Sequence, residues 1–144
     1  MRSCHLDAVA RLEQLCFSTP WSREAIGDEL GNPNAVYLVA VEAGAVLGYG
    51  GMRSAAGEFY FDNIAVDPVY RRRGVGRKLV RAMADCAKEA GGLFVSLEVR
   101  ASNLPAIELY RGLGFEEAGR RRGFYQKPAE DGLIFTKWFE ENDK

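Results

Sequence analysis

The chain has 144 residues, of which 47% are hydrophobic, so it is long enough for one domain that buries about two-thirds of its unfolded surface. Its formal net charge is -1, which excludes a protein that is drawn as a whole to nucleic acid or to an anionic membrane. The three cysteines, Cys4, Cys16 and Cys86, contain no Cys-x-x-Cys pair, so they suggest neither a disulfide framework nor a zinc cluster and favour a reducing, cytoplasmic location.

The first half of the chain predicts two helices followed by three strands. Apolar residues at helical spacing predict a helix over residues 7–16, and a weaker pattern predicts a second helix over residues 22–30. Apolar and β-branched runs predict a hairpin with strands over residues 37–41 and 45–52. A turn then leads into a third strand, which we expect over residues 58–66.

The second half begins with a helix, a strand and another helix. Apolar positions on one face predict a helix over residues 77–90, which stops at the pair of glycines that follows. A strand is expected over residues 94–99. Asn103 is expected to cap a helix that has Pro105 in its first turn and ends within residues 112–114.

Two further strands complete the pattern. We expect them over residues 115–119 and 133–139, on either side of a loop over residues 127–132. All these elements together predict one mixed α/β (α+β) domain over residues 1–144, with a β-α-β crossover near its centre. The acidic tail, residues 140–144, is expected to be exposed to solvent.

A basic loop with two glycines joins the third strand to the next helix. Gly74 and Gly76 have no Cβ, so the backbone can adopt unusual dihedral angles there and its N–H groups can approach an anion closely. The following helix adds free N–H donors and a partial positive charge at its N-terminus. Together these features predict a pyrophosphate site. The loop fits neither the P-loop nor the dinucleotide fingerprint, and an ordinary turn with solvated arginines is the alternative.

The end of the preceding strand, residues 63–66, has two interpretations. It is either plain core, or its backbone forms hydrogen bonds with an extended, amide-bearing ligand, as sheet edges do with peptides. The side chains of this segment do not decide between the two.

Five motifs share one family resemblance. They are Phe17-x-x-Pro20-Trp21-Ser22, residues 63–68, Arg71-x-x-Gly74-x-Gly76, residues 97–115 and Arg121-x-x-Phe124-Tyr125. In these motifs the chain resembles the GNAT superfamily of acetyl-CoA-dependent N-acetyltransferases, and most closely its RimI branch, which acetylates the N-terminal alanine of a small-subunit ribosomal protein. The resemblance covers almost the whole chain. It implies the GNAT fold, a mixed central sheet of about six to seven strands with helices on both faces.

The resemblance implies acetyl-CoA as co-substrate and no metal. The backbone of one short segment would pair with the pantetheine arm, namely Ile64, Ala65 and Val66. A second segment would hold the pyrophosphate, namely Arg71, Arg72, Arg73, Gly74, Val75, Gly76 and Arg77. Asn103 would also touch the acetyl-CoA. The residues themselves also predict no metal site, because the single histidine, His5, has no His, Cys or carboxylate at ligand spacing.

The resemblance also implies that Glu98 is the general base and Tyr110 the general acid. A water-exposed strand glutamate and a core aromatic are the alternatives. The chemistry suits both roles, because a carboxylate can accept an amine proton through water and a phenol of pKa about 10 can protonate a thiolate while staying neutral at pH 7. Neutralising an α-amino group at pH 7 costs about 1.4 kcal/mol and a lysine about 4.6 kcal/mol, which mildly favours a terminal amine.

The acceptor side is expected to use aromatic side chains. Trp21 is either core or a wall of the acceptor groove, and Phe124 and Tyr125 are candidates to line that groove. The arginines at positions 120–122 read most simply as a solvated turn. Gly123 precedes the aromatic pair at a position where family members often carry a polar residue.

The sequence therefore predicts a protein N-terminal acetyltransferase that transfers directly within a ternary complex. The acceptor is expected to be a ribosomal protein N-terminus, with no nucleic acid or membrane partner, and the enzyme a cytoplasmic monomer with at most weak dimerisation. One alternative keeps acetyl-CoA as the cofactor and changes the acceptor to a lysine side chain or a small-molecule amine. Another is a catalytically silent CoA-sensing or scaffolding module, for which Glu98→Gln would leave any measured activity unchanged.

Overall fold

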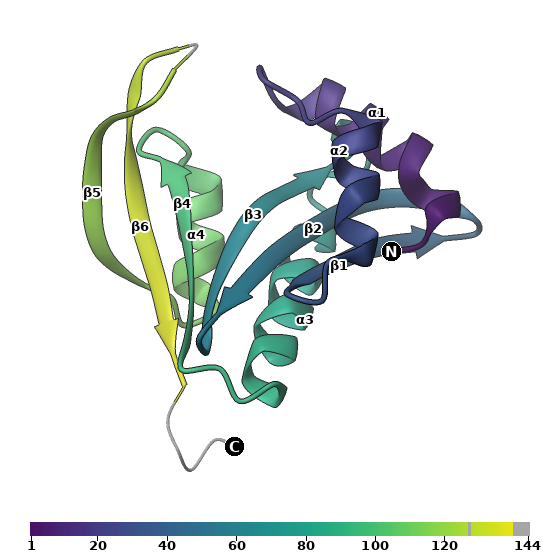
Figure 1. Ribbon diagram of the computed structural model, residues 1–144. Coiled ribbons are helices and arrows are strands. Elements are labelled where there is room, and N and C mark those ends of the chain that lie inside the picture. Colours follow the sequence, from purple (N-terminus) through teal and green to yellow (C-terminus); the bar gives the residue numbers. More distant parts are fainter. Residues whose placement is uncertain (127, 140–144) are drawn as a thin grey trace.

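The computed structural model describes residues 1–126 and 128–139, and over these residues the chain forms one twisted, mixed sheet with helices on both faces (Figure 1). The strand order is β1-β2-β3-β4-β6-β5. The strands are β1 (Ala35–Glu42), β2 (Ala45–Ala55), β3 (Glu58–Val66), β4 (Phe94–Arg100), β5 (Glu116–Tyr125) and β6 (Glu130–Trp138). The helices are α1 (Leu6–Cys16), α2 (Arg23–Asp28), α3 (Val75–Glu89) and α4 (Leu104–Gly112), with short 3-10 turns at Ser3–His5, Glu29–Gly31 and Pro68–Tyr70. The predicted fold class is confirmed.

Local signals account for several helix ends. The Ser22 side chain accepts a hydrogen bond from the Ala25 N–H at 3.1 Å and caps α2. Asn103 caps α4 in the same way through the Ala106 N–H at 3.3 Å, with Pro105 in the first turn. Gly91 follows α3 with φ of +80°, a left-handed conformation that ends a helix and favours glycine.

The sheet splits between its two central strands. β3 and β4 are parallel and pair only where Glu58, Phe59 and Tyr60 lie beside residues 94–96. Beyond Tyr60 the two strands diverge (Figure 1). β4 instead pairs along its whole length with β6, from Phe94 to Arg100. The split leaves residues 61–66 of β3 without a neighbouring strand on the side that faces β4.

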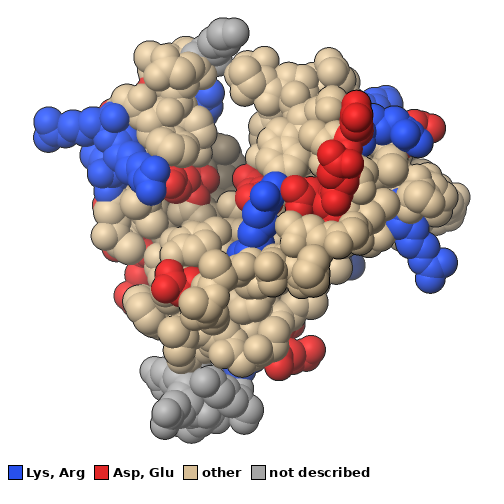
Figure 2. All heavy atoms as spheres, viewed as in Figure 1, with Lys and Arg blue, Asp and Glu red and all other residues tan. Residues whose placement is uncertain are grey.

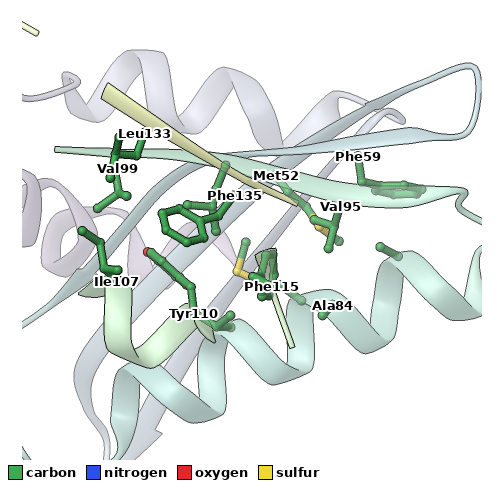
Figure 3. Packing of buried hydrophobic residues seen from close by; sticks show 14 residues of the cluster. Met52, Phe59, Ala84, Val95, Val99, Ile107, Tyr110, Phe115, Leu133 and Phe135 are labelled. Carbon is green, nitrogen blue, oxygen red and sulfur yellow. The ribbon is translucent and has the colours of Figure 1, made fainter. Parts of the chain in front are cut away.

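Two hydrophobic cores lie on opposite faces of the sheet. On one face α3 and α4 pack against the strands, and this larger core includes Val80, Met83, Val95, Tyr110 and Phe135 (Figure 3). On the other face α1 and α2 pack against β1, β2 and β3, in a core that includes Val9, Leu12, Ile26, Tyr49 and Ala65. Both faces of β3 are therefore covered, whereas α1 and α2 leave β4, β6 and β5 open on their side (Figure 1).

Three of the boundaries that differ from the sequence prediction lie next to the loop before α3 or at the β5–β6 hairpin. α3 begins at Val75 rather than at residue 77, because the loop glycine at position 74 already forms its N-terminal boundary. β5 continues to Tyr125 and β6 begins at Glu130, so the arginines at positions 120–122 lie on a strand and not in a solvated turn. Pairing with β6, interrupted by a bulge between Arg121 and Tyr125, holds this polar segment extended. The predicted exposure of the tail, residues 140–144, falls outside the described residues.

Candidate functional site

The loop between β3 and α3 presents a row of backbone N–H groups. Arg72 and Gly74 adopt left-handed conformations with φ of +65° and +79°, which turn the chain sharply into the helix. None of the N–H groups of residues 72–77 donates to an acceptor among the described residues, whereas the next one, Lys78, donates to the Gly74 carbonyl at 3.1 Å. Successive free N–H groups at a helix N-terminus bind anions, so this loop has the form of a phosphate site.

The base of the loop is held by Asp67. This carboxylate is 4% exposed, accepts from the Val69 N–H at 3.0 Å and pairs with Arg11 at 3.0 Å. The hydrogen bond from Val69, and secondly the Arg11 guanidinium, lower the pKa of Asp67 below its ordinary value. The carboxylate therefore stays ionised and keeps the turn at residues 68–70 in place at neutral pH.

Two arginine side chains of the loop, those of Arg71 and Arg73, already have partners. Arg73 lies 3.2 Å from Glu42 and 5.5 Å above the Tyr70 ring. Arg71 lies 3.6 Å from the Cys16 sulfur. These two side chains are thus partly engaged elsewhere, so the backbone N–H groups carry much of the capacity of the loop for an anion, and Gly74 is the residue whose conformation requires glycine.

Next to the loop, the free edge of β3 offers further backbone groups. Ile64, Ala65 and Val66 pair with β2 on one side, and among the described residues no strand pairs with them on the side that faces β4. An extended ligand with amide groups fits such an edge, because it can complete the hydrogen bonding that the split interrupts.

A cleft of about 780 Å³ opens from this split towards the face that α1 and α2 only partly cover. Figure 2 shows the corresponding notch at the top of the molecule, between the β5–β6 side and the α1–α2 side. The cleft brings together seven of the predicted site residues, namely Trp21, Ile64, Glu98, Asn103, Tyr110, Phe124 and Tyr125. The other predicted residues, Ala65, Val66 and those at positions 71–77, do not line the cleft and lie along the continuation of β3 into the loop.

Glu98 projects from β4 into the middle of the cleft. Its side chain is 23% exposed, and its Oε1 lies 3.4 Å from the Arg121 Nε. Its Oε2 is buried and has no hydrogen-bond partner among the described residues. On the neighbouring strand, a Cβ at Gly132 would lie 3.4 Å from this oxygen, so glycine leaves the space beside it open. A buried carboxylate oxygen without a partner is costly and is suited to accept a proton or a hydrogen bond from a bound molecule.

Tyr110 reaches the cleft from α4. Its ring packs 5.8 Å from Phe115 and 6.5 Å from Phe135, centroid to centroid, and Figure 3 shows it leaning out of the helix towards Phe135. Burial, and secondly the nearby Tyr125, raise the pKa of Tyr110 to about 12. The phenol therefore keeps its proton at neutral pH and can donate it.

Aromatic side chains form two facing walls of the cleft. Trp21 comes from the α1–α2 connection, and its ring lies 5.3 Å from the Arg53 guanidinium carbon. Phe124 and Tyr125 come from the end of β5 and contact each other edge to face at 5.0 Å. Arg100 stacks 4.5 Å above Tyr125, so it fixes that ring. These walls leave room for an extended chain end next to Glu98.

Glu13 and Gly132 were not found from the sequence. Glu13 is completely buried and bonded to the walls of the cleft. It lies on the same face of α1 as Val9 and Leu12, so a carboxylate at a core position of the helix was the signal that could have identified it. Gly132 carries no such signal, because its proximity to Glu98 depends on strand pairing. Among the described residues no helix is long and apolar enough to cross a membrane, and no group of three His, Cys, Asp or Glu side chains could hold a metal ion.

These parts suit a ligand with a pyrophosphate and an extended, amide-bearing arm. The loop amides would hold the diphosphate, the β3 edge would pair with the arm, and the reactive end would lie between Glu98 and Tyr110. The second reactant would then enter the cleft from the side away from the loop. The Glu98 carboxylate and the protonated Tyr110 phenol would be available for proton transfer.

Comparisons with known proteins agree with this chemistry. The model of the Acetyltransferase (GNAT) family matches residues 6–115. The chain is 39% identical over 134 residues to N-alpha-acetyltransferase RimI of Mycobacterium tuberculosis, covering 89% of this chain and 83% of that protein. It is 35% identical over 132 residues to [ribosomal protein bS18]-alanine N-acetyltransferase of Escherichia coli K12, covering 92% and 87%. The crystal structure of the Escherichia coli ribosomal-protein-S18-alanine N-acetyltransferase superposes with a TM-score of 0.86 at 33% identity, covering 99% of this chain and 94% of that one.

Proposed function

Because the chain belongs to the acetyltransferase (GNAT) family, we propose that it transfers the acetyl group of acetyl-CoA to the N-terminal α-amine of a protein that begins with alanine. The acceptor named for its relatives, ribosomal protein bS18, is the first candidate. No metal takes part in this reaction. The observation that carries the proposal is the buried Oε2 of Glu98, which has no hydrogen-bond partner within residues 1–126 and 128–139. It lies at the split in the sheet, between a backbone anion site and an open cleft.

Acetyl-CoA binds by its diphosphate to the amides of residues 72–77. Their lack of acceptors among the described residues supports this role, and the positive end of the α3 dipole adds to it. The β3 edge at Ile64, Ala65 and Val66 pairs with the pantetheine arm. Asn103 lines the same cleft and keeps an amide N–H₂ group for the ligand while its carbonyl oxygen caps α4.

Glu98 removes the proton from the acceptor amine, through a water molecule. The amine nitrogen attacks the thioester carbonyl, the new C–N bond forms and the C–S bond breaks. An α-amino group of pKa about 8 gives up its proton at neutral pH about 3 kcal/mol more cheaply than a lysine of pKa about 10.4. The carboxylate of Glu98 is therefore better matched to a terminal amine than to a lysine.

Tyr110 returns a proton to the departing thiolate. Its position in the cleft and its pKa of about 12 support this role, because the phenol is fully protonated over the working pH range. Both substrates are bound at the same time. Transfer is direct, because Cys16 is the cysteine that lines the cleft, and the single histidine of the chain, His5, does not line it and cannot activate that thiol as a nucleophile.

We further propose that the chain acts as one domain and as a monomer in the cytoplasm. A ribosomal protein is made and assembled in that compartment, and a single copy already combines the anion site, the carboxylate and both walls of the cleft. A weak dimer is compatible with this arrangement, because no element of a second copy is needed to complete the site.

A peptide panel tests the activity directly. Peptides that start with alanine, serine, methionine or leucine are compared with an N-terminally blocked peptide that contains lysine, and with a polyamine. We expect the alanine peptide to be acetylated fastest. Faster acetylation of the lysine peptide or the polyamine would overturn the assignment of the acceptor. Calorimetry with CoA tests the cofactor separately, and no binding at millimolar CoA would overturn the whole proposal.

A further inference from the structure

Glu13 is a buried carboxylate that the reaction does not use. Its side chain is 0% exposed, and among the described residues it forms no ion pair with a lysine or an arginine. A buried charge without a cationic partner is expensive unless its oxygens are well hydrogen-bonded. Glu13 therefore needs a structural reason for its place in the core under α1.

Three donors from three different segments meet this carboxylate. The Trp21 backbone N–H donates to Oε1 at 2.8 Å. The Asn63 side-chain amide donates to Oε2 at 3.1 Å, and the Tyr49 hydroxyl donates to the same oxygen. One side chain on α1 thus joins the α1–α2 connection to β2 and β3. Hydrogen bonds to a charged acceptor are about twice as strong as neutral ones, and any donor that moves away leaves charge unsatisfied.

The segments that Glu13 joins, the α1–α2 connection and β3, both line the cleft. Trp21 belongs to the connection whose residues 17–19 and 21 line the cleft, and Asn63 lies in the bulge of β3 just before Ile64. The Trp21 ring is held from the other side, because Arg53 lies 5.3 Å from it and is bound to Asp62 at 2.9 Å. Glu13 holds the Trp21 backbone and Arg53 holds the Trp21 ring. The separation between Trp21 and the β3 edge therefore depends on both residues.

We propose that Glu13 is a positioning residue that sets the width of the cleft beside Glu98, and with it the preference for a small first side chain on the acceptor. This inference rests on the proposed function. A first residue whose amine lies near Glu98 has its side chain between the β3 edge and the Trp21 wall. A bulky side chain needs that wall to move outward, and the three hydrogen bonds to Glu13 oppose the movement.

Three variants test the role in graded steps. Glu13→Ala removes all three hydrogen bonds. Glu13→Gln keeps the shape but has one acceptor oxygen instead of two, and Tyr49→Phe removes one donor while keeping its ring stacked 6.3 Å from Tyr37. Val95→Ala is the control, because it weakens the core on the opposite face without touching the α1–α2 connection.

Kinetics with an alanine peptide and a leucine peptide are compared for each variant. A displacement of about 1 Å at a reactive centre costs on the order of a hundredfold in rate. Greater mobility of Trp21 and its neighbours affects the fit of the peptide rather than the reacting atoms, so the loss should be smaller. We expect Glu13→Ala to raise the KM of the alanine peptide about tenfold. The ratio of kcat/KM for the alanine peptide over the leucine peptide is expected to fall least in Tyr49→Phe, more in Glu13→Gln and most in Glu13→Ala. The Kd of acetyl-CoA, measured by calorimetry, stays within about twofold, because the loop amides are untouched.

A second readout does not depend on activity. The chain has two tryptophans, so in a Trp138→Phe background Trp21 is the sole tryptophan and its quenching by acrylamide reports the position of the wall. We expect quenching to increase in the Glu13 variants and in Tyr49→Phe, and to stay unchanged in Val95→Ala. If Glu13→Ala does not fold, Glu13→Gln and Tyr49→Phe decide the outcome.

Two results would overturn the inference. One is an unchanged alanine-to-leucine ratio together with unchanged Trp21 quenching in the folded variants. The other is a loss that the Val95→Ala control reproduces, which would reduce Glu13 to general stability. If instead the parent protein acetylates none of the peptides, the proposed function fails, while the quenching experiment still reports whether Glu13 holds the wall.

Discussion

The loop before α3 offers backbone groups from one continuous segment, residues 72–77, whereas the cleft around Glu98 is lined by side chains from α1, β3, β4, α4 and β5. The loop depends on local dihedral angles, above all at Gly74. The cleft depends on contacts between segments that are far apart in the chain. Substitutions of loop side chains should therefore be tolerated better than substitutions of cleft side chains, and the following experiments test that difference.

The largest effect is expected for Glu98→Gln. The amide cannot accept the amine proton, so kcat/KM should fall on the order of a hundredfold or more, while calorimetry should give an unchanged Kd for acetyl-CoA. Glu117→Gln is a matched control, because that carboxylate lies on β5 outside the cleft lining and forms an ion pair with Arg111 at 3.7 Å. If the two variants are equally active, Glu98 is not the base.

A smaller loss, about tenfold in kcat, is expected for Tyr110→Phe. A thiol of pKa about 8.5 is a good leaving group, so its protonation contributes less than removal of the amine proton. Steady-state kinetics would measure the loss, and Tyr125→Phe gives the comparison from the other tyrosine of the cleft. A larger loss in Tyr125→Phe would transfer the role of acid to that residue.

The same tyrosine predicts a pH dependence of stability. The folded-state pKa of Tyr110 is raised to about 12, against about 10 in the unfolded chain, so the folded state binds the proton more tightly. This contribution is complete below pH 10 and is lost as the pH rises towards 12. Urea unfolding at pH 8 and pH 11 should show a smaller decrease for Tyr110→Phe than for the parent. Equal decreases in the free energy of unfolding for the two proteins would contradict a raised pKa at Tyr110.

In the loop, Gly74→Ala should have a moderate effect. A Cβ at this position meets no atom within 4 Å, but φ is +79°, and an L-residue in that conformation costs about 1 kcal/mol. We expect the free energy of unfolding to fall by about this amount and acetyl-CoA binding to weaken about fivefold. Gly74→Asn should cost less, since asparagine tolerates left-handed angles better. Equal losses for both would show that a side chain at this position, and not the backbone angle, is the problem.

The smallest effect is expected for Arg73→Gln. Its guanidinium pairs with Glu42 and stacks on Tyr70, so the Kd of acetyl-CoA should change by less than about threefold when the amides hold the diphosphate. Calorimetry would measure it. A loss of tenfold or more would contradict the contrast between loop and cleft, because a loop side chain would then hold the anion.

Much of the fold followed from local patterns, and the largest miss was a strand that has no such pattern. The hairpin of β1 and β2, the Asn103 cap and the glycine at position 74 are set by neighbouring residues. The extension of β5 through its arginines was missed, because an edge strand with exposed, polar side chains has no hydrophobic alternation to reveal it. Strand pairing across residues 116–136 decided that segment.

The amino-acid sequence by itself determined the family, the order of helices and strands, and the loop that suits a diphosphate, because dihedral preferences and hydrogen bonds within a segment act over a few residues. Only the tertiary structure decided that a Glu98 oxygen lies beside Gly132 without a partner in the described part of the chain, and that Glu13 lies buried among donors from three segments. Burial and polar partners arise from contacts between distant parts of the chain, and no short pattern specifies them.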